Sequence, residues 1–239
     1  MAIIPIINFL LVFFYLPETK PKSNSNKLKK LLKNPLKQLL KVFEEEKIRK
    51  LSLAFFIYFI AFTGLTNILI FFLQESLGWT TKASSGTLVV VGIIAIIVQG
   101  GLIGPLVKQF GEMKLTLIGS GFILVACSLL ITAPKENATI NIYSAVSFLA
   151  VGAGLITPTL RALISKKLDV DRQGSILSNL QGLQSLGGVL GIAMAGRVYD
   201  SFGPKSPFIA GSIILIFMIY LIAEGKINNS FNDQKSKVF

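Results

Sequence analysis

The stretch GTLVVVGIIAIIVQGGLIGPLVKQFGE, residues 86–112, decides the fold class of this 239-residue chain. Its first part, residues 86–107, carries no charged side chain. A helix of about 20 apolar residues, rising about 1.5 Å per residue, spans the hydrocarbon core of a bilayer, which is about 30 Å thick. A soluble helix has a charged face opposite its apolar stripe, and this run has none. It therefore predicts a helix that crosses a membrane.

Further uncharged runs reach or approach the same length. They are residues 51–73, 115–133, 141–160, 175–196 and 207–223. The composition agrees, because 52% of the residues are hydrophobic and only 15% are charged, against about 25% charged residues in a soluble domain. We predict an all-α membrane protein with six transmembrane helices. A preceding apolar run at residues 2–16 is too short to cross a membrane alone.

The net charge of +12 is distributed unevenly over the two sides of the predicted membrane. If successive loops alternate between the sides, one side holds the basic segments 17–50, 108–114, 161–174 and 224–239. The few basic residues on the other side are Lys82, Lys135, Arg197 and Lys205. Cytoplasmic loops are enriched in Lys and Arg, so we expect residues 17–50 and the C-terminus in the cytoplasm. The basic residues orient the chain in a bilayer, and we predict no nucleic-acid partner.

Catalytic and metal-binding chemistry has little support in the sequence. The chain has no histidine, and Cys127 is its only cysteine, so the commonest metal ligand, the commonest general base and a disulfide framework are missing. No phosphate-binding glycine loop follows a predicted strand. The N-terminus has no basic residue before its apolar run, and we do not expect a signal peptide. We predict no enzyme, no cofactor and no metal site.

A near repeat connects two of the predicted loops. GPLVKQFGE at Gly104–Glu112 returns as GRVYDSFGP at Gly196–Pro204. The residues that match at one constant offset are Gly104, Leu106, Phe110, Gly111, Gly119 and Ser120 with Gly196, Val198, Phe202, Gly203, Gly211 and Ser212. The first loop is expected on the basic side of the membrane and the second on the opposite side. Three spans followed by three spans of opposite orientation form a 3+3 inverted repeat, as in many secondary transporters.

The motif G-x-L-x-x-x-F-G at residues 104–111 lies in a short loop between two spans and resembles the loop signature of the major facilitator superfamily, roughly G-x-L-a-D-r-x-G-r. Lys108 stands at the acidic position of that signature and Glu112 at its last basic position, so both charges are inverted. In the second copy, the acidic position is occupied by Asp200.

Two other stretches resemble the same family. YLPETK at residues 15–20 looks like the end of helix six in drug-efflux facilitators. GAGLITPTLRALISKKLDVDRQGSILSNLQGLQSLGGVLG at residues 152–191 resembles helices ten and eleven of tetracycline-type and multidrug antiporters. The resemblance implies a C-terminal half of the facilitator fold. Its parts are the tail of helix six at 1–16, a basic cytoplasmic linker with an amphipathic helix at 17–50, a six-helix domain at 51–223 and a cytoplasmic tail at 224–239.

The function implied by this resemblance is efflux of small drug-like or amphipathic molecules by alternating access. It implies the bilayer of a bacterial inner membrane, a small-molecule substrate and a proton as a candidate coupling ion. Helices one to five have no counterpart, so the chain is a fragment, a mis-started gene or a half-transporter that pairs with a missing N-terminal half. Two alternatives stay open: a facilitator for a different small solute, and a non-transporting membrane scaffold or partner.

The linker has an amphipathic pattern in its second part. The apolar residues at helical spacing are Leu28, Leu31, Leu32, Leu36, Leu39, Leu40 and Phe43. Lysines fill the other face, and Asn34-Pro35 fits a break with proline at the first helical position of the second piece. Such a helix either lies on the anionic inner leaflet or packs on the inner face of the transporter.

The candidate substrate-binding residues are neutral, because the six predicted spans contain no Asp, Glu, Lys or Arg. We expect the cavity to be lined by Asn67, Gln99, Gln181, Gln184 and Ser185. The alternative role for these side chains is hydrogen bonding between helices. The resemblance agrees with the first role, since helices seven, eight, ten and eleven of a facilitator face its central cavity.

Glycines and a proline mark candidate moving parts. The residues expected to act in loop gating are Gly104, Lys108, Gly111 and Asp200. Small residues four apart, as in Gly100 with Gly104 and Gly187 with Gly191, allow two helices to approach closely. Pro158 is expected to kink the fourth predicted span.

Overall fold

The computed structural model describes residues 35–134 and 138–236, with side chains over most of that range. The chain divides into two compact units, Met1–Gln38 and Leu39–Phe239. The description that follows concerns the second unit, apart from the first residues of α3.

The described residues form helices and no strands. The elements are α3 (Pro35–Glu44), α4 (Glu46–Leu77), α5 (Thr81–Ile97), the π-helical turn η1 (Val98–Leu102), α6 (Ile103–Phe110), α7 (Glu112–Ile131), α8 (Thr139–Ser165), α9 (Val170–Phe202) and α10 (Ser206–Ser236). The segment α5–η1–α6 runs as one long stretch, Thr81–Phe110. The all-α prediction is confirmed, and α4 starts before and α10 ends after the predicted boundaries at 51 and 223.

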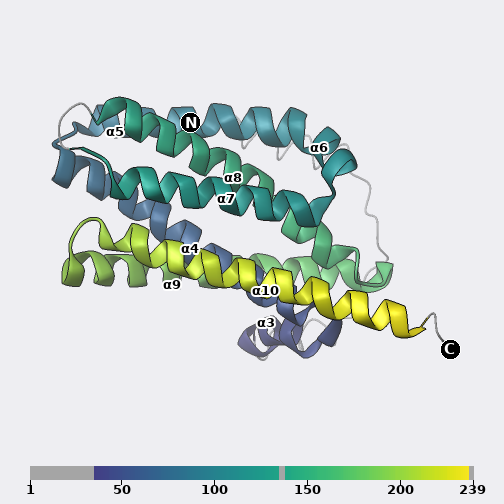
Figure 1. Cartoon of the computed structure of the whole chain (residues 1–239). Helices are drawn as coiled ribbons and strands as arrows, with labels where there is room; N and C mark the ends of the chain where they lie inside the picture. Colours follow the sequence, from purple (N-terminus) through teal and green to yellow (C-terminus); the bar gives the residue numbers. More distant parts are fainter. Residues whose placement is uncertain (1–34, 135–137, 237–239) are drawn as a thin grey trace, which may run out of the picture. The chain divides into compact units, whose positions relative to one another are not determined.

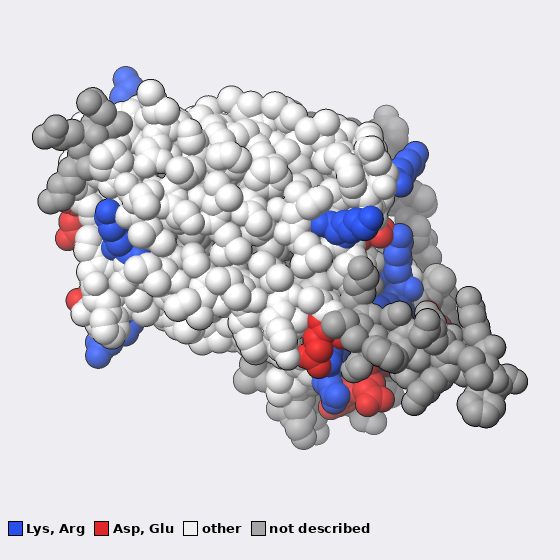
Figure 2. Space-filling model, viewed as in Figure 1, with Lys and Arg blue, Asp and Glu red and all other residues white. Residues whose placement is uncertain are grey.

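Five of the described helical stretches are long and apolar enough to cross a membrane. They are Glu46–Leu77, Thr81–Phe110, Glu112–Ile131, Thr139–Ser165 and Ser206–Glu224. The predicted run 175–196 lies in α9, which is long enough to cross a membrane. Its glycines and amide side chains lower its mean hydropathy, and it is not among the five stretches. On the face drawn in Figure 2, charged side chains gather toward two ends, and a broad band between them is uncharged. The protein is an integral membrane protein.

Two central helices organise the bundle (Figure 1). Helix α4 packs on α9 and α10, and α8 packs on α7 and α5. The two groups meet where α7 contacts α10 and α4 contacts α8. The core of α4 is aromatic, with Phe55, Tyr58 and Phe72 almost fully buried. Phe72 meets Phe208 of α10 edge to face, with 5.2 Å between the ring centroids.

Glycines set the close contact between α4 and α9. A Cβ atom added to Gly191 would stand 2.2 Å from the carbonyl oxygen of Ile60, and one added to Gly187 would stand 3.1 Å from that of Phe56. The backbones of the two helices therefore touch at this pair. Gly100 and Gly104 differ, because an added Cβ would meet nothing within 4 Å. Both lie on an exposed face, and no close helix approach exists there among the described residues.

The segment α5–η1–α6 is the most exposed of the spans. Only Ser84, Thr87 and Val98 are buried in it, and large apolar side chains such as Ile93 and Ile96 are more than half exposed. The described helices cover the inner edge of this stretch through α8 and leave its other sides open to lipid or to another protein surface.

The two repeated loops fold into the same turn. Gly111 ends α6 with φ of +76°, and Gly203 ends α9 with φ of +90°. The amide nitrogen of each glycine donates to the carbonyl oxygen four residues earlier, that of Val107 or Tyr199, at 2.9 Å. Positive φ strains a residue with a Cβ atom, so glycine is required at both positions.

The described end of the linker helix packs on the bundle. Pro35 is the first residue of α3, as the sequence predicts. Val42 is fully buried, and Leu39 and Phe43 pack beside it in the core. A Cβ atom on Gly182 of α9 would stand 2.3 Å from the Leu39 side chain. Residues 28–34, which hold the other half of the predicted amphipathic helix, lie outside the described residues.

Candidate substrate-binding site

Four of the five predicted cavity residues are exposed, namely Asn67, Gln99, Gln181 and Ser185, and Gln184 is half-buried. Asn67 is exposed on α4, and its amide nitrogen donates to the carbonyl oxygen of Thr63 at 2.9 Å. Gln99 is exposed in η1, the π-helical turn that interrupts the long stretch. Neither side chain makes a hydrogen bond to Gln181 or Gln184 in the part of the chain that the structure describes.

The other amides meet a residue that the sequence reasoning missed. The predicted fourth span ended at residue 160, but α8 continues to Ser165, so Arg161 lies near the end of a helix that is long and apolar enough to cross a membrane. The expectation that the spans themselves carry no charged residue stays a prediction. A terminal nitrogen of the Arg161 guanidinium donates to the side-chain oxygen of Gln181 at 2.8 Å and also to that of Gln184. A neighbouring hydroxyl, that of Ser185, donates to the Gln181 carbonyl oxygen at 3.2 Å.

The direction of the Arg161 side chain follows from helix geometry. Side chains on a helix tilt toward its N-terminus, so Arg161 reaches from the end of α8 back toward the middle of the bundle. Its partner Gln184 lies about 20 Å along α9 from the start of that helix, at about 1.5 Å per residue. The guanidinium is therefore half-buried between α8 and α9, about one turn from the end of α8.

Aromatic and hydroxyl groups of α4 complete the cluster. The guanidinium carbon lies 5.9 Å from the ring centroid of the buried Phe55, a cation–π arrangement. One turn away, the hydroxyl oxygens of Tyr58 and Thr157 are 3.4 Å apart. Pro158 lies between Thr157 and Arg161 inside α8, and its ring leaves the carbonyl of Gly154 without the usual helical N–H donor.

The guanidinium is only partly satisfied by its described neighbours. Arginine has five N–H donors, and the hydrogen bonds to Gln181 and Gln184 both start from one terminal nitrogen. The Nε atom is buried and has no partner in the described part of the chain. No carboxylate of the described residues forms an ion pair with Arg161. A pocket of about 360 Å³ adjoins it, lined by Arg161, Ala162, Ser165 and Leu177. The cluster offers hydrogen bonds and a positive charge.

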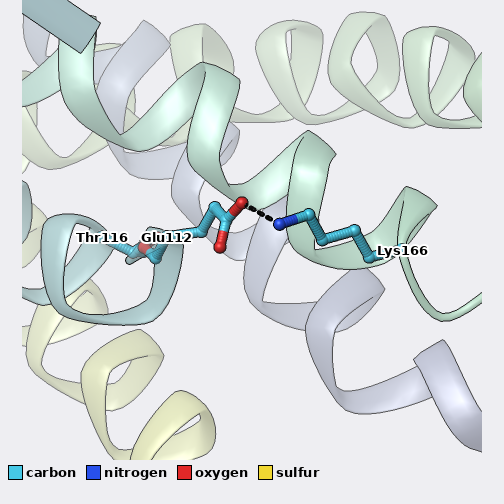
Figure 3. A network of polar contacts seen from close by, with 3 residues as sticks. All are labelled: Glu112, Thr116 and Lys166. Atoms are coloured by element: carbon cyan, nitrogen blue, oxygen red, sulfur yellow. Dashed lines mark hydrogen bonds and ion pairs between the residues drawn. The ribbon is translucent and has the colours of Figure 1, made fainter. Parts of the chain in front are cut away.

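Ion pairs connect the helix ends near the basic loops. Glu112, the first residue of α7, pairs with Lys166 beyond the end of α8, as Figure 3 shows. The Thr116 hydroxyl donates to the Glu112 carbonyl oxygen at 2.8 Å and lies 2.8 Å from the Thr159 hydroxyl of α8. The inverted charge of the loop motif thus serves a contact between α7 and α8.

Further pairs connect other helices at the same end. The Arg172 guanidinium of α9 lies 2.8 Å from the Glu45 carboxylate, and the Lys50 ammonium of α4 lies 2.7 Å from the Glu224 carboxylate of α10. At the other end of the bundle, the Tyr199 hydroxyl donates to the Glu75 carboxylate at 2.6 Å.

The predicted gating residues lie near these contacts without joining them. Lys108 is exposed in the last turn of α6, and Asp200 is exposed near the end of α9. Neither forms an ion pair with a described residue. Gly104 is exposed in α6, and Gly111 is the turn residue already described. The ion pair at the turn between α6 and α7 therefore involves Glu112 and Lys166 and not Lys108.

Comparison with known proteins identifies the family of this chain. The sequence model of the Major Facilitator Superfamily matches residues 1–192. The tetracycline resistance protein of class C from Escherichia coli is 26% identical over 130 residues, which are 54% of this chain and 32% of that protein. The class H protein from Pasteurella multocida is 28% identical over 134 residues, 56% of this chain and 32% of that protein.

A second group of relatives is matched over more of the chain. The hippocampus abundant transcript-like protein 1 of Homo sapiens is 21% identical over 212 residues, which are 80% of this chain and 41% of that protein. The chain thus spans between about a third and two-fifths of the length of these relatives. The family match covers most of the chain, including the helices that carry Arg161, Gln181 and Gln184. This chain belongs to the Major Facilitator Superfamily.

Proposed function

We propose that this chain forms the C-terminal six-helix half of a transporter that moves small molecules by alternating access. The observation that carries the proposal is the cluster of Arg161, Gln181 and Gln184, in which an arginine near the end of α8 is joined to two amides of α9 by hydrogen bonds. Polar and charged groups are costly within a membrane, and they mark substrate or ion pathways. α9 is then the sixth span, and its amides and glycines are the reason for its lower hydropathy.

A 3+3 inverted repeat accounts for the packing. The first triple is α4, α5–α6 and α7, and the second is α8, α9 and α10. The leading helix of each triple packs on the second and third helices of the other, α4 on α9 and α10, and α8 on α5 and α7. Matched residues also have matched surroundings. Ser120 and Ser212 each donate to the carbonyl oxygen four residues earlier at 2.8 Å, and Gly119 and Gly211 each pack tightly against the leading helix of the other triple.

A second six-helix half is proposed to cover the exposed helices α5 and α9. Their outer faces carry large apolar side chains, among them Leu88, Ile96, Val189 and Met194, that are about half exposed or more. The chain corresponds to less than half of each relative's length. The substrate cavity would then lie between the two halves, with Asn67, Gln99, Gln181, Gln184 and Ser185 on its wall. The candidates for gating at the loops remain Gly104, Lys108, Gly111 and Asp200. The candidates for positions about which the helices move during alternating access are Gly187, Gly191 and Pro158.

The proposed orientation places the linker and the C-terminus in the cytoplasm, and the proposed location is a bacterial inner membrane. The orientation is supported by the excess of Lys and Arg in the loops of one side. The proposed activity is efflux of drug-like or amphipathic molecules, which the similarity to tetracycline resistance proteins supports, and the proposed coupling ion is a proton. The hippocampus abundant transcript proteins are matched over more of the chain, and they favour a second candidate, a different small solute.

Access to the proposed site from both sides tests alternating access. A cysteine replaces Gln184 in a chain whose buried Cys127 is changed to alanine, and the chain is produced together with a candidate N-terminal half. We expect membrane-impermeant thiol reagents to label position 184 from either side, with a ratio that a substrate changes. Labelling from one side alone, unaffected by any substrate, would contradict alternating access and favour a membrane scaffold.

A further inference from the structure

We propose that Arg161 is the anchor of an anion-binding site between α8 and α9, and that its ligand is a small organic anion with a carboxylate, sulfonate or phosphate group. The inference rests on the proposed function only in one respect, that the bound anion is the transported solute. Binding itself requires only the geometry of the described helices.

The first argument is charge balance. Gln181 and Gln184 accept hydrogen bonds from Arg161 but are neutral, and no described carboxylate pairs with it. A half-buried positive charge without a counter-ion is unfavourable unless an opposite charge or water reaches it. The three ion pairs of the described chain lie at the helix ends and leave this cation without a counter-ion. An anionic ligand supplies the missing charge.

The second argument is the orientation of the donors. The two glutamine oxygens hold one terminal nitrogen of the guanidinium, and Phe55 covers one face of it. These contacts hold one end of the guanidinium and leave the other terminal nitrogen without a described hydrogen-bond partner. A fixed planar guanidinium with unused N–H groups matches the two oxygens of a carboxylate or the three of a sulfonate.

The third argument is space. The pocket of about 360 Å³ beside Arg161 is lined by Ala162, Ser165 and Leu177 as well as by the arginine. The pocket is open to the surface, and its volume lies near the lower end of the about 300 to 1,000 Å³ found for small-molecule sites. The lining is one charged group, one hydroxyl and two apolar side chains, so the ligand that fits it has an anionic head and an apolar body.

A purely structural role makes a different prediction. If Arg161 only cross-links α8 to α9, a glutamine at position 161 retains a side-chain N–H donor for Gln181 and Gln184. The Arg161→Gln variant would then keep every property of the protein except stability. If Arg161 binds an anion, the same variant loses the preference for negatively charged ligands.

The experiment measures thermal unfolding of the full chain in a neutral detergent. Cys127 is the only cysteine and is buried, so a thiol-reactive dye reports unfolding without an added label. The probes share one naphthalene ring: naphthalene-2-sulfonate, 2-naphthalenemethanol and 2-naphthylmethylammonium. We expect only the sulfonate to raise the unfolding temperature in a saturable way. Arg161→Gln should need at least about tenfold more sulfonate for half of the rise.

Two further variants complete the design. Arg172→Gln removes a more exposed arginine whose partner is Glu45, and it should leave the sulfonate response unchanged. Arg161→Lys keeps the charge but loses the planar fork, so it should bind the sulfonate more weakly and still prefer it to the ammonium probe. The lysine variant keeps the inference testable if Arg161→Gln does not fold.

Several results would overturn the inference. They are an equal response of the wild-type protein and Arg161→Gln to the sulfonate, an equal effect of the ammonium probe, and a folded Arg161→Lys without anion preference. An Arg161-dependent rise with phosphatidylglycerol but not with the sulfonate would assign the site to lipid and also overturn it. The proposed function is tested separately. Transport of uncharged solutes without anion binding would reject this site and leave the transporter proposal standing. Anion binding without any transport would reject the transporter proposal and leave the site standing.

Discussion

Close contact of α4 and α9 at Gly191 makes a sharp prediction for Gly191→Ala. The new Cβ atom would stand 2.2 Å from the carbonyl oxygen of Ile60, whereas ordinary contacts begin at 3.4 Å. The obstacle is backbone, so no side-chain rotation relieves it, and the two helices must separate by about 1 Å at this point. Overpacking of this kind costs about 1 to 3 kcal/mol. At about 2 to 4 °C per kcal/mol for a protein of this size, the unfolding temperature should fall by about 2 to 12 °C.

The matched control is Gly196→Ala in the same helix. A Cβ atom there meets nothing within 4 Å, and alanine favours a helix over glycine by about 1 kcal/mol, so the unfolding temperature should stay constant or rise slightly. Both variants are compared with wild type by the thermal unfolding assay that uses Cys127. If Gly191→Ala were as stable as Gly196→Ala, the backbone contact between α4 and α9 would not exist as described.

Three other outcomes are expected. Gly203→Ala should lower the unfolding free energy by about 1 to 2 kcal/mol, because φ of +90° strains a residue with a Cβ atom; an unchanged melting curve would refute the turn. A double-mutant cycle of Glu112→Gln and Lys166→Gln should give a coupling energy below about 1 kcal/mol, since the lysine side chain is 66% exposed; a larger coupling would show that the pair is shielded from water. Cysteines at Lys82 and Lys108, near opposite ends of one helical stretch, should label from opposite sides of the membrane, and labelling from the same side would exclude that span.

The uncharged runs predicted most of the helices because an uninterrupted apolar run has few alternatives to a membrane helix. The turns at Gly111 and Gly203 could also be expected from the repeat, since two glycines at one offset mark two equivalent backbone positions. The ends of the helices could not be read in this way. A helix extends beyond its uncharged run at either end where charged side chains reach water or a partner. Helix α4, for example, begins at Glu46, before the uncharged run starts at residue 51.

Arg161 was missed for the same reason. The predicted span ended at the first charged residue, but α8 continues for one more turn and its arginine turns back into the bundle. A signal was present in the sequence: Gln181 and Gln184, three positions apart, share a helical face and need a donor from a neighbouring helix. The exposure of Asn67 and Gln99 had no comparable signal, because a single sequence does not tell which face of a span meets its own bundle.

Transport by paired halves is the central claim, and substrate flux into proteoliposomes tests it most directly. The chain is reconstituted alone and with a candidate N-terminal half, in wild-type form and with Gln184→Ala. We predict flux of a small solute only when both halves are present, and at least about tenfold slower flux for Gln184→Ala, because that variant removes a hydrogen-bond acceptor of the half-buried guanidinium. Absence of flux in every combination, or flux that the Gln184→Ala variant leaves unchanged, would contradict the account.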